Sequence, residues 1–384
     1  MNILSSLISY IFKLVFNPIY ILMSILVFYQ YNRLEKKEMR LLGRVKESYI
    51  KHFFIALIKG LAVGVFISIM FDLFDIEFNV TCFKYAFVLS ILFFLVKPRY
   101  ACIAYSGAGA CIIGIFLDTG LQSYRSVLLT IAILHFAEGI LIYFDGYKSY
   151  LPLFLERENK LIGGFSLYRY WCVPFFIIPQ ALQVASYGGF TETIFLPIAA
   201  ILGYTDLSIT DSPKIAAKTA AKSLVFFSMI LILLIALSYI NPIFLFLAMV
   251  SSPLMHELII LKRQKDQNKA EPSFTLSEKG VRILDVLPNG LGKELGLSIG
   301  DELVMINNMR VITKNQIIEA MKYCNDKLEI IYIKFKGNKV VKKTYKNIKD
   351  KKMELLILTD NAHYTMDIEG QSGILQRFIG YFQK

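Results

Sequence analysis

The residues most able to do chemistry in this chain are four histidines, five cysteines and a few acidic side chains inside apolar segments. His256 and Glu257 begin a His-Glu-Leu-Ile-Ile sequence, in which Ile260 stands where an HExxH metalloprotease has its second histidine. That chemistry needs two histidines one helical turn apart to bind Zn²⁺ and a glutamate to activate water. The missing histidine argues against zinc proteolysis, and we expect the pair to anchor a helix end.

The other metal-binding and nucleophilic residue types are scattered. The cysteines are odd in number, widely spaced and without a CxxC pair: Cys82, Cys102, Cys111, Cys172 and Cys324. This pattern excludes a disulfide framework and fits a reducing compartment. A metal site would have to be assembled from single, distant histidines, and neither a phosphate-binding nor a dinucleotide-binding fingerprint is present. We therefore expect no catalytic residues, no metal and no cofactor, and a chain that is not an enzyme.

One ionisable pair lies within an apolar segment. His135 and Glu138 are spaced i, i+3, so they share one face of a helix. Ionisable groups within a membrane are costly and often functional, which is compatible with a proton-coupled transporter. The alternative is a hydrogen-bonded pair with a structural function inside a helical bundle.

These residues must be positioned by membrane-embedded elements. The chain is 55% hydrophobic, with a mean hydropathy of +0.51. We predict an α-helical polytopic membrane bundle over residues 1–261, with seven to nine spans and nine preferred. The apolar segments are residues 8–29, 52–71, 80–96, 100–117, 126–144, 171–187, 194–204, 221–238 and 241–258. Segment 194–204 is short for a helical span, since a span needs about 17–25 residues.

Charge predicts the orientation of the bundle. With nine spans, alternate loops collect lysine and arginine while the opposite loops carry mainly acidic residues, and basic loops stay in the cytoplasm. This places the C-terminal region in the cytoplasm of a multi-pass plasma-membrane protein. The net charge of +12 then indicates contact with anionic lipid rather than with nucleic acid.

The sequence changes character after the last apolar segment. Residues 262–273 are polar and are predicted to be a linker, and residues 274–360 are predicted to form a small α+β domain. Within it, Gly280–Val311 resembles the first half of a PDZ domain: Gly-Leu, two residues, Gly-Asp, a strand and an Asn-Asn turn. Thr313 and Gln316 predict a capping box for the following helix. The tail, residues 361–384, is predicted to carry an amphipathic helix.

The PDZ resemblance implies a peptide-binding groove, because PDZ domains add an extended peptide to a sheet edge beside a helix. The implied groove residues are Phe274, Leu276, Gly280, Val281, Ile283, Ile317, Ala320 and Met321. The helix residues could equally be core. A lysine-rich hairpin is predicted to meet the membrane surface through Lys334, Lys336, Lys339, Lys342 and Lys343, or to be a solvated face.

Three membrane-proximal stretches extend the resemblance. Glu156–Pro179, Leu196–Lys214 and Ser251–Ile260, followed by the PDZ-like domain, resemble the MinJ-like polytopic division-site proteins of low-GC Gram-positive bacteria. The resemblance implies a non-enzymatic scaffold for septum placement that links a DivIVA-like coiled-coil protein to a MinD-like division inhibitor. It implies enrichment at septum and poles, and self-association is left open. The alternatives are a transporter-like bundle with a regulatory PDZ domain, and a non-catalytic relative of PDZ membrane proteases.

Overall fold

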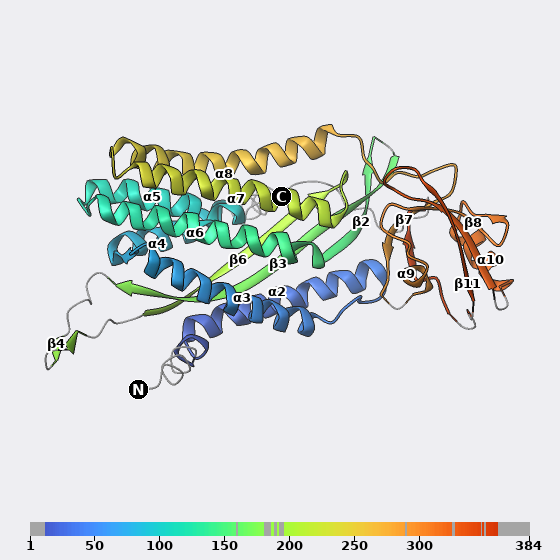
Figure 1. Cartoon of the computed structure of the whole chain (residues 1–384), viewed down its shortest axis with the longest axis horizontal. Coiled ribbons are helices and arrows are strands. Elements are labelled where there is room, and N and C mark those ends of the chain that lie inside the picture. The colour runs from blue at the N-terminus through green and yellow to red at the C-terminus, as the bar shows by residue number, and fades with distance from the viewer. Residues whose placement is uncertain are drawn as a thin grey trace, which may run out of the picture.

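The structure is a computed structural model in which an elongated helical bundle carries a small sheet-rich domain at one end (Figure 1). It describes residues 12–158, 160–179, 186–187, 190–191, 196–288, 290–324, 327–346, 348 and 351–359. The predicted amphipathic helix in the tail lies outside the described residues.

The helices of the bundle begin and end at clear local signals. Asn17 caps the first, whose first residue is Pro18, and Gly43 ends it in a left-handed conformation. Besides the helical residues 12–15, seven helices make up the bundle within the described residues: α2 (Pro18–Leu42), α3 (Tyr49–Leu73), α4 (Val80–Val96), α5 (Ile103–Phe116), α6 (Leu121–Asp145), α7 (Pro213–Leu237) and α8 (Ile243–Lys269). They confirm helices in seven of the nine predicted apolar segments.

Four helices are long and apolar enough to cross a membrane: α3, α6 with the following turn, α7 and α8. The apolar window of α6 is 72% buried, against 22% in α3 and α8 and 33% in α7. α6 is therefore the central helix of the bundle, and the outer helices present their apolar faces outward, as lipid contact requires. α4 and α5 are shorter apolar helices.

The described residues of the two remaining apolar segments are in strands: 171–179 and 186–187 of the first and 196–204 of the second. The prediction of helical spans there was wrong. β3 (Lys160–Pro179) pairs antiparallel with β6 (Leu196–Ser208) from Phe165↔Ser208 to Ile177↔Leu196, and β2 (Tyr150–Arg157) pairs with the first part of β3. The pair passes between the helices of the bundle (Figure 1). The physical reason is length and proline: segment 194–204 suits a transmembrane strand of about 9–11 residues, and Pro174 breaks a helix.

The helices complete the hydrogen bonding of β3 where no strand pairs with it. The Tyr31 hydroxyl donates to the carbonyl of Tyr170 at 2.8 Å and accepts from the Tyr170 N–H at 3.2 Å. Ser68 accepts from the N–H of Phe176 at 3.0 Å. A Cβ atom at Gly64 would overlap the backbone of β3, so glycine lets α3 approach the strand. This satisfies the rule that backbone groups in an apolar bundle need internal partners.

Short elements connect these parts. They are β1 (Glu77–Phe78), which pairs with the end of β3, the 3₁₀ turns η1 (Pro98–Ala101) and η2 (Gly146–Lys148), and the two-stranded pair β4 (Ser186–Tyr187) and β5 (Phe190–Thr191).

The C-terminal domain has the predicted order of strand, small helix, strand, longer helix and hairpin. Its elements are β7 (Val281–Val286), α9 (Leu291–Glu294), β8 (Glu302–Ile306), β9 (Met309–Arg310), α10 (Lys314–Lys322), β10 (Lys327–Ile333), β11 (Val340–Lys346) and β12 (Leu355–Ile357). The sheet order is β11-β10-β8-β7-β12, with β9 paired to β8. The capping box of Thr313 and Gln316 is confirmed. α8 continues to Lys269, so most of the predicted linker is helical.

Candidate functional site: the domain junction and a buried Cys-His cluster

The junction between bundle and C-terminal domain is built around one buried carboxylate. Asp285 of β7 is 2% exposed and lies 2.5 Å from the Lys46 ammonium, which comes from the loop between α2 and α3. The Tyr150 hydroxyl of β2 donates to Asp285 at 2.6 Å. Burial, and then the negative charge of Asp285, raise the pKa of Tyr150. This contact fastens the domain to both α-helical and β-strand parts of the bundle.

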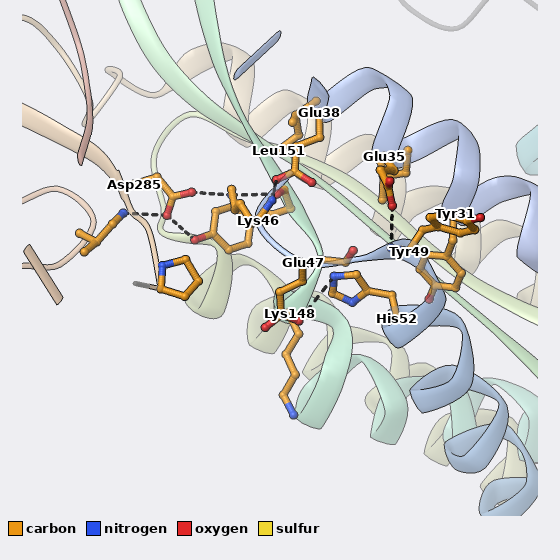
Figure 2. A pocket seen from close by; sticks show the side chains of 15 residues that line it. Tyr31, Glu35, Glu38, Lys46, Glu47, Tyr49, His52, Lys148, Leu151 and Asp285 are labelled. Atoms are coloured by element: carbon orange, nitrogen blue, oxygen red, sulfur yellow. Dashed lines mark hydrogen bonds and ion pairs between the residues drawn. The ribbon is translucent and has the colours of Figure 1, made fainter. Parts of the chain in front are cut away.

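A cavity of about 170 Å³ lies beside this contact (Figure 2). Most of its charged lining comes from the C-terminal half of α2, the following loop and the start of α3. These parts supply Glu35, Glu38, Glu47 and His52, and Lys148 and Asp285 complete the charged lining. The Glu35 carboxylate accepts from the Tyr49 N–H at 2.7 Å, so part of this charge is used in capping α3. The cavity is small, its lining mixes these charged groups with apolar side chains such as Leu34 and Leu151, and residues of β7 line one side.

An aromatic stack forms the second fastening. Phe274 is fully buried between Phe165 of β3 and Phe335 of the β10–β11 hairpin, with ring centroids 4.9 and 5.1 Å away. The Gly163 N–H donates to the Phe274 carbonyl at 2.7 Å. The domain therefore meets the bundle at Asp285 and at Phe274.

The residues of the implied groove are mostly in the interior. Val281, Ile283, Ile317 and Ala320 are 1, 0, 7 and 3% exposed, and Met321 packs on the same core. Gly280 lies against the Leu303 backbone, whereas Leu276 is 41% exposed. Phe274 serves the junction.

β7 has strand partners on both sides. Val281 and Arg282 pair with β8, and Ile283 to Val286 pair with β12. A peptide strand therefore has no free edge on β7. Within the described residues, the open edges of this sheet belong to β11 and β12.

The residues of the predicted basic surface lie on the β10–β11 hairpin, where Lys342 is 2.6 Å from the Glu329 carboxylate. Lys336, Lys339, Lys342 and Lys343 are exposed, while Lys334 lies 2.8 Å from the Asp301 carboxylate. Because Phe335 in the hairpin turn packs on Phe274, the turn lies at the bundle end of the domain. Contact of these lysines with lipid stays a prediction.

A buried charge network lies at the C-terminal end of α6, which sequence reasoning missed. Arg169 of β3 is 1% exposed and donates to Asp145 at 2.7 Å, and the Trp171 indole donates to the same carboxylate at 3.0 Å. Lys59 of α3 also contacts Asp145. Arg169 is buried because the extended strand β3 carries it into the bundle. The sequence feature that indicated this network was a basic residue within an apolar run.

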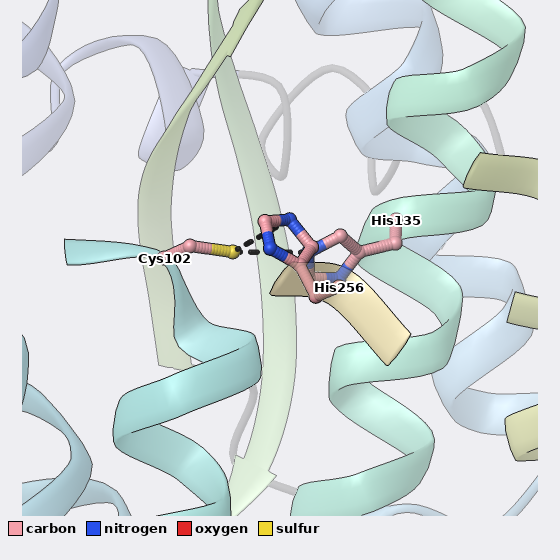
Figure 3. Close-up of side chains that lie close together, drawn as sticks. All are labelled: Cys102, His135 and His256. Carbon is pink, nitrogen blue, oxygen red and sulfur yellow. Dashed lines mark hydrogen bonds between the residues drawn. The ribbon is translucent and has the colours of Figure 1, made fainter. Parts of the chain in front are cut away.

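A second cluster brings together three residues that the sequence left scattered. Cys102 precedes α5, His135 is on α6 and His256 is on α8, and Figure 3 shows their side chains pointing toward one another. The Cys102 sulfur is 3.0 Å from Nε2 of His135 and 3.7 Å from Nε2 of His256. The hydrogen bonds of His135 go to Cys102 and to the Ile131 carbonyl rather than to Glu138.

Glu257, which follows His256 in the sequence that partly matches HExxH, lies beside this cluster. Its carboxylate accepts from the Tyr105 hydroxyl at 2.7 Å and lies 2.6 Å from the Arg99 guanidinium. The Tyr105 hydroxyl is in turn 3.1 Å from Nδ1 of His256. The pair lies inside α8 rather than at its end, so the expectation that it anchors a helix end was wrong.

Comparison with known proteins gives one distant similarity. The chain is 21% identical over 221 residues to the cell division topological determinant MinJ of Bacillus subtilis (strain 168), a stretch that covers 54% of this chain and 55% of the relative. The chain thus matches about half the length of that relative. No family model matches, and no solved structure matches.

Proposed function

We propose that this chain is a membrane-anchored, non-enzymatic scaffold of the division site, which holds a PDZ-like domain in a fixed orientation at the cytoplasmic membrane surface. The observation that carries the proposal is the double fastening of the domain to the bundle, through Asp285 and through Phe274. A flexible tether would suffice for a module that only captures peptides. A fixed orientation suits a protein that must present two partners to each other.

The resemblance to a cell division determinant supplies the biological context. The sequence resemblance to MinJ-like division-site proteins implies the partners, a DivIVA-like coiled-coil protein and a MinD-like division inhibitor, and enrichment at septum and poles. Anchoring both partners at the membrane raises their effective concentration, so weak individual contacts suffice. Self-association of the chain would add further binding sites in the same plane.

The sheet edges favour a specific docking mode. Because β7 is paired on both sides, an added peptide strand would pair with β12 or β11. β11 presents exposed lysines, which discourage strand addition and favour the membrane surface. We therefore place the peptide strand on β12.

The test is the position of septa in cells. In a deletion strain, we expect septa to move from their normal place, and a fluorescent fusion of the full chain to restore them and to collect at septum and poles. A chain ending after residue 273 should stay in the membrane and fail to restore placement. Uniform membrane distribution together with normal septa in the deletion strain contradicts the proposal.

A matched pair of variants separates anchoring from peptide binding. The N–H of Leu355 faces the open edge of β12, because Glu354 and Leu358 on either side of the strand are bonded to β7. Leu355→Pro removes this N–H and should abolish partner recruitment while leaving the fusion in the membrane. Val340→Pro at the start of β11 is the control for the other open edge and should leave recruitment intact. If V340P and not L355P loses recruitment, the assignment to β12 is wrong.

A further inference from the structure

We propose that Cys102, His135 and His256 bind one thiophilic metal ion, Cu⁺ or Zn²⁺, within the helical bundle. The three ligand atoms lie within 4.8 Å of one another and come from three separate segments of the chain. This site is independent of the scaffold function and of the metalloprotease sequence that His256 and Glu257 almost complete.

The spacing of the donor atoms suits a metal ion. Thiolate and imidazole ligands at the usual metal–sulfur and metal–nitrogen lengths are about 3.6 Å apart in a tetrahedral site. The sulfur of Cys102 is 3.7 Å from Nε2 of His256, close to that value. Its distance of 3.0 Å from Nε2 of His135 is that of a hydrogen bond. A rotation of the thiol that moves the sulfur by about half an ångström would admit the ion.

The surrounding hydrogen bonds fix both histidines in the metal-binding tautomer. The Ile131 carbonyl can only accept, so Nδ1 of His135, at 2.7 Å, carries the proton. The Tyr105 hydroxyl donates its proton to Glu257, so its oxygen accepts from Nδ1 of His256. Both Nε2 atoms are therefore unprotonated, and both lone pairs converge on the sulfur.

Without a metal, the single thiol proton cannot serve both histidine lone pairs. One thiol S–H can donate to one Nε2, and it is closer to that of His135. The second lone pair, on Nε2 of His256, then has the same thiol, 3.7 Å away, as its only hydrogen-bond partner among the described residues. A metal ion accepts electron pairs from all three atoms at once, so the lone pair of His256 also gains a partner. Hydrogen bonds to the far nitrogen of each ligating histidine are also the usual second layer of a metal site.

Charge favours Cu⁺. One thiolate and two neutral imidazoles around Cu⁺ sum to zero, whereas Zn²⁺ leaves a net charge of +1. A neutral complex costs less in apolar surroundings, and the cluster packs against the Phe227 ring, 5.3 Å from His135 and 5.9 Å from His256. Thiolate and imidazole ligands suit both ions. The nearby Glu257 is already paired with Arg99 and does not offset the charge.

The experiment uses the full chain in detergent, stripped with a chelator. Cu⁺ is titrated against a colorimetric Cu⁺ chelator, and Co²⁺ is used as the spectroscopic probe for Zn²⁺. We expect one ion per chain. If the site selects Zn²⁺, Co²⁺ should give a thiolate-to-Co²⁺ absorption band. If the site selects Cu⁺, Cu⁺ should bind tightly and Co²⁺ should give no such band. Cys102→Ser and His256→Gln should each weaken binding at least about 100-fold, and Tyr105→Phe about 10–100-fold.

Cys324→Ser is the matched control, because Cys324 is a free, partly buried thiol in the C-terminal domain and should leave binding unchanged. Thermal melting and gel filtration show which variants remain folded. Binding of neither ion to the folded wild-type chain overturns the proposal. Equal binding by folded C102S and wild type also overturns it.

Discussion

Replacing Asp145 should lower the free energy of unfolding more than replacing any other single polar residue of the bundle. It is fully buried and receives charge or hydrogen bonds from Arg169, Trp171 and Lys59. Asp145→Asn removes the negative charge and leaves Arg169, 1% exposed, without a counter-charge. Breaking a buried ion pair from one side costs about 3–5 kcal/mol.

The reverse substitution should cost less. Arg169→Met leaves Asp145 with the Lys59 ammonium and the Trp171 indole, so the carboxylate keeps a counter-charge. We expect a loss of about 2–3 kcal/mol. The double variant should be more stable than the sum of the two losses predicts, by about 1–3 kcal/mol, because neither charge is then left alone.

Lys148 provides the control for this network. Its ammonium is 3.8 Å from the Asp145 carboxylate but its side chain is 49% exposed, so solvent screens the pair. Lys148→Met should change the free energy of unfolding by less than about 1 kcal/mol. The assay is unfolding of the full chain in mixed micelles with increasing denaturing detergent. A D145N loss no larger than that of R169M, or additive losses in the double variant, would falsify the reasoning.

The remaining predictions concern the strand, the junction and the domain. Gly64→Ala places a methyl group against the β3 backbone and should lower stability by about 1–3 kcal/mol or more in the same assay; a smaller loss means that α3 can move. Lys46→Met leaves Asp285 without its cation, so limited proteolysis should cut between α8 and β7 faster, unless this contact does not hold the domain. Hydrogen bonds from Lys351, then Tyr345, lower the pKa of Glu294 below 4.5. The stabilisation is therefore present above pH 4.5 and lost as pH falls through the folded-state value; a carboxyl NMR titration unaltered by Lys351→Met contradicts this.

The fold could be predicted where periodicity and caps carry the information. The helical segments, the capping box at Thr313 and the order of elements in the C-terminal domain follow from local signals. The strands β3 and β6 could not be separated from helices by hydropathy, because an element buried on all sides is uniformly apolar in either form. Pro174 and the short segment 194–204 were the available signals for strands.

The site was harder, because its parts meet only in three dimensions. No spacing rule connects Cys102, His135 and His256, which lie far apart in the chain and converge through the packing of α5, α6 and α8. The implied groove depends on the same kind of information. Which face of α10 and which edge of β7 look outward depends on β12, a short strand near the end of the described region that the sequence did not indicate.

β3 gives the molecule an inextensible link between its two ends. Between Gly163, which is bonded to the C-terminal domain, and Ile177 near the opposite end of the bundle, the extended backbone spans about 46 Å. That exceeds the hydrocarbon thickness of a bilayer, about 30 Å. An extended strand is already near its full length, so it cannot be stretched further. It can shift along its neighbour only in steps of two residues, which is the repeat of its pairing. A pull on the domain would therefore be carried along β3, and shared with β6 and the helices bonded to it, as far as the end of β3 where β1 pairs with it.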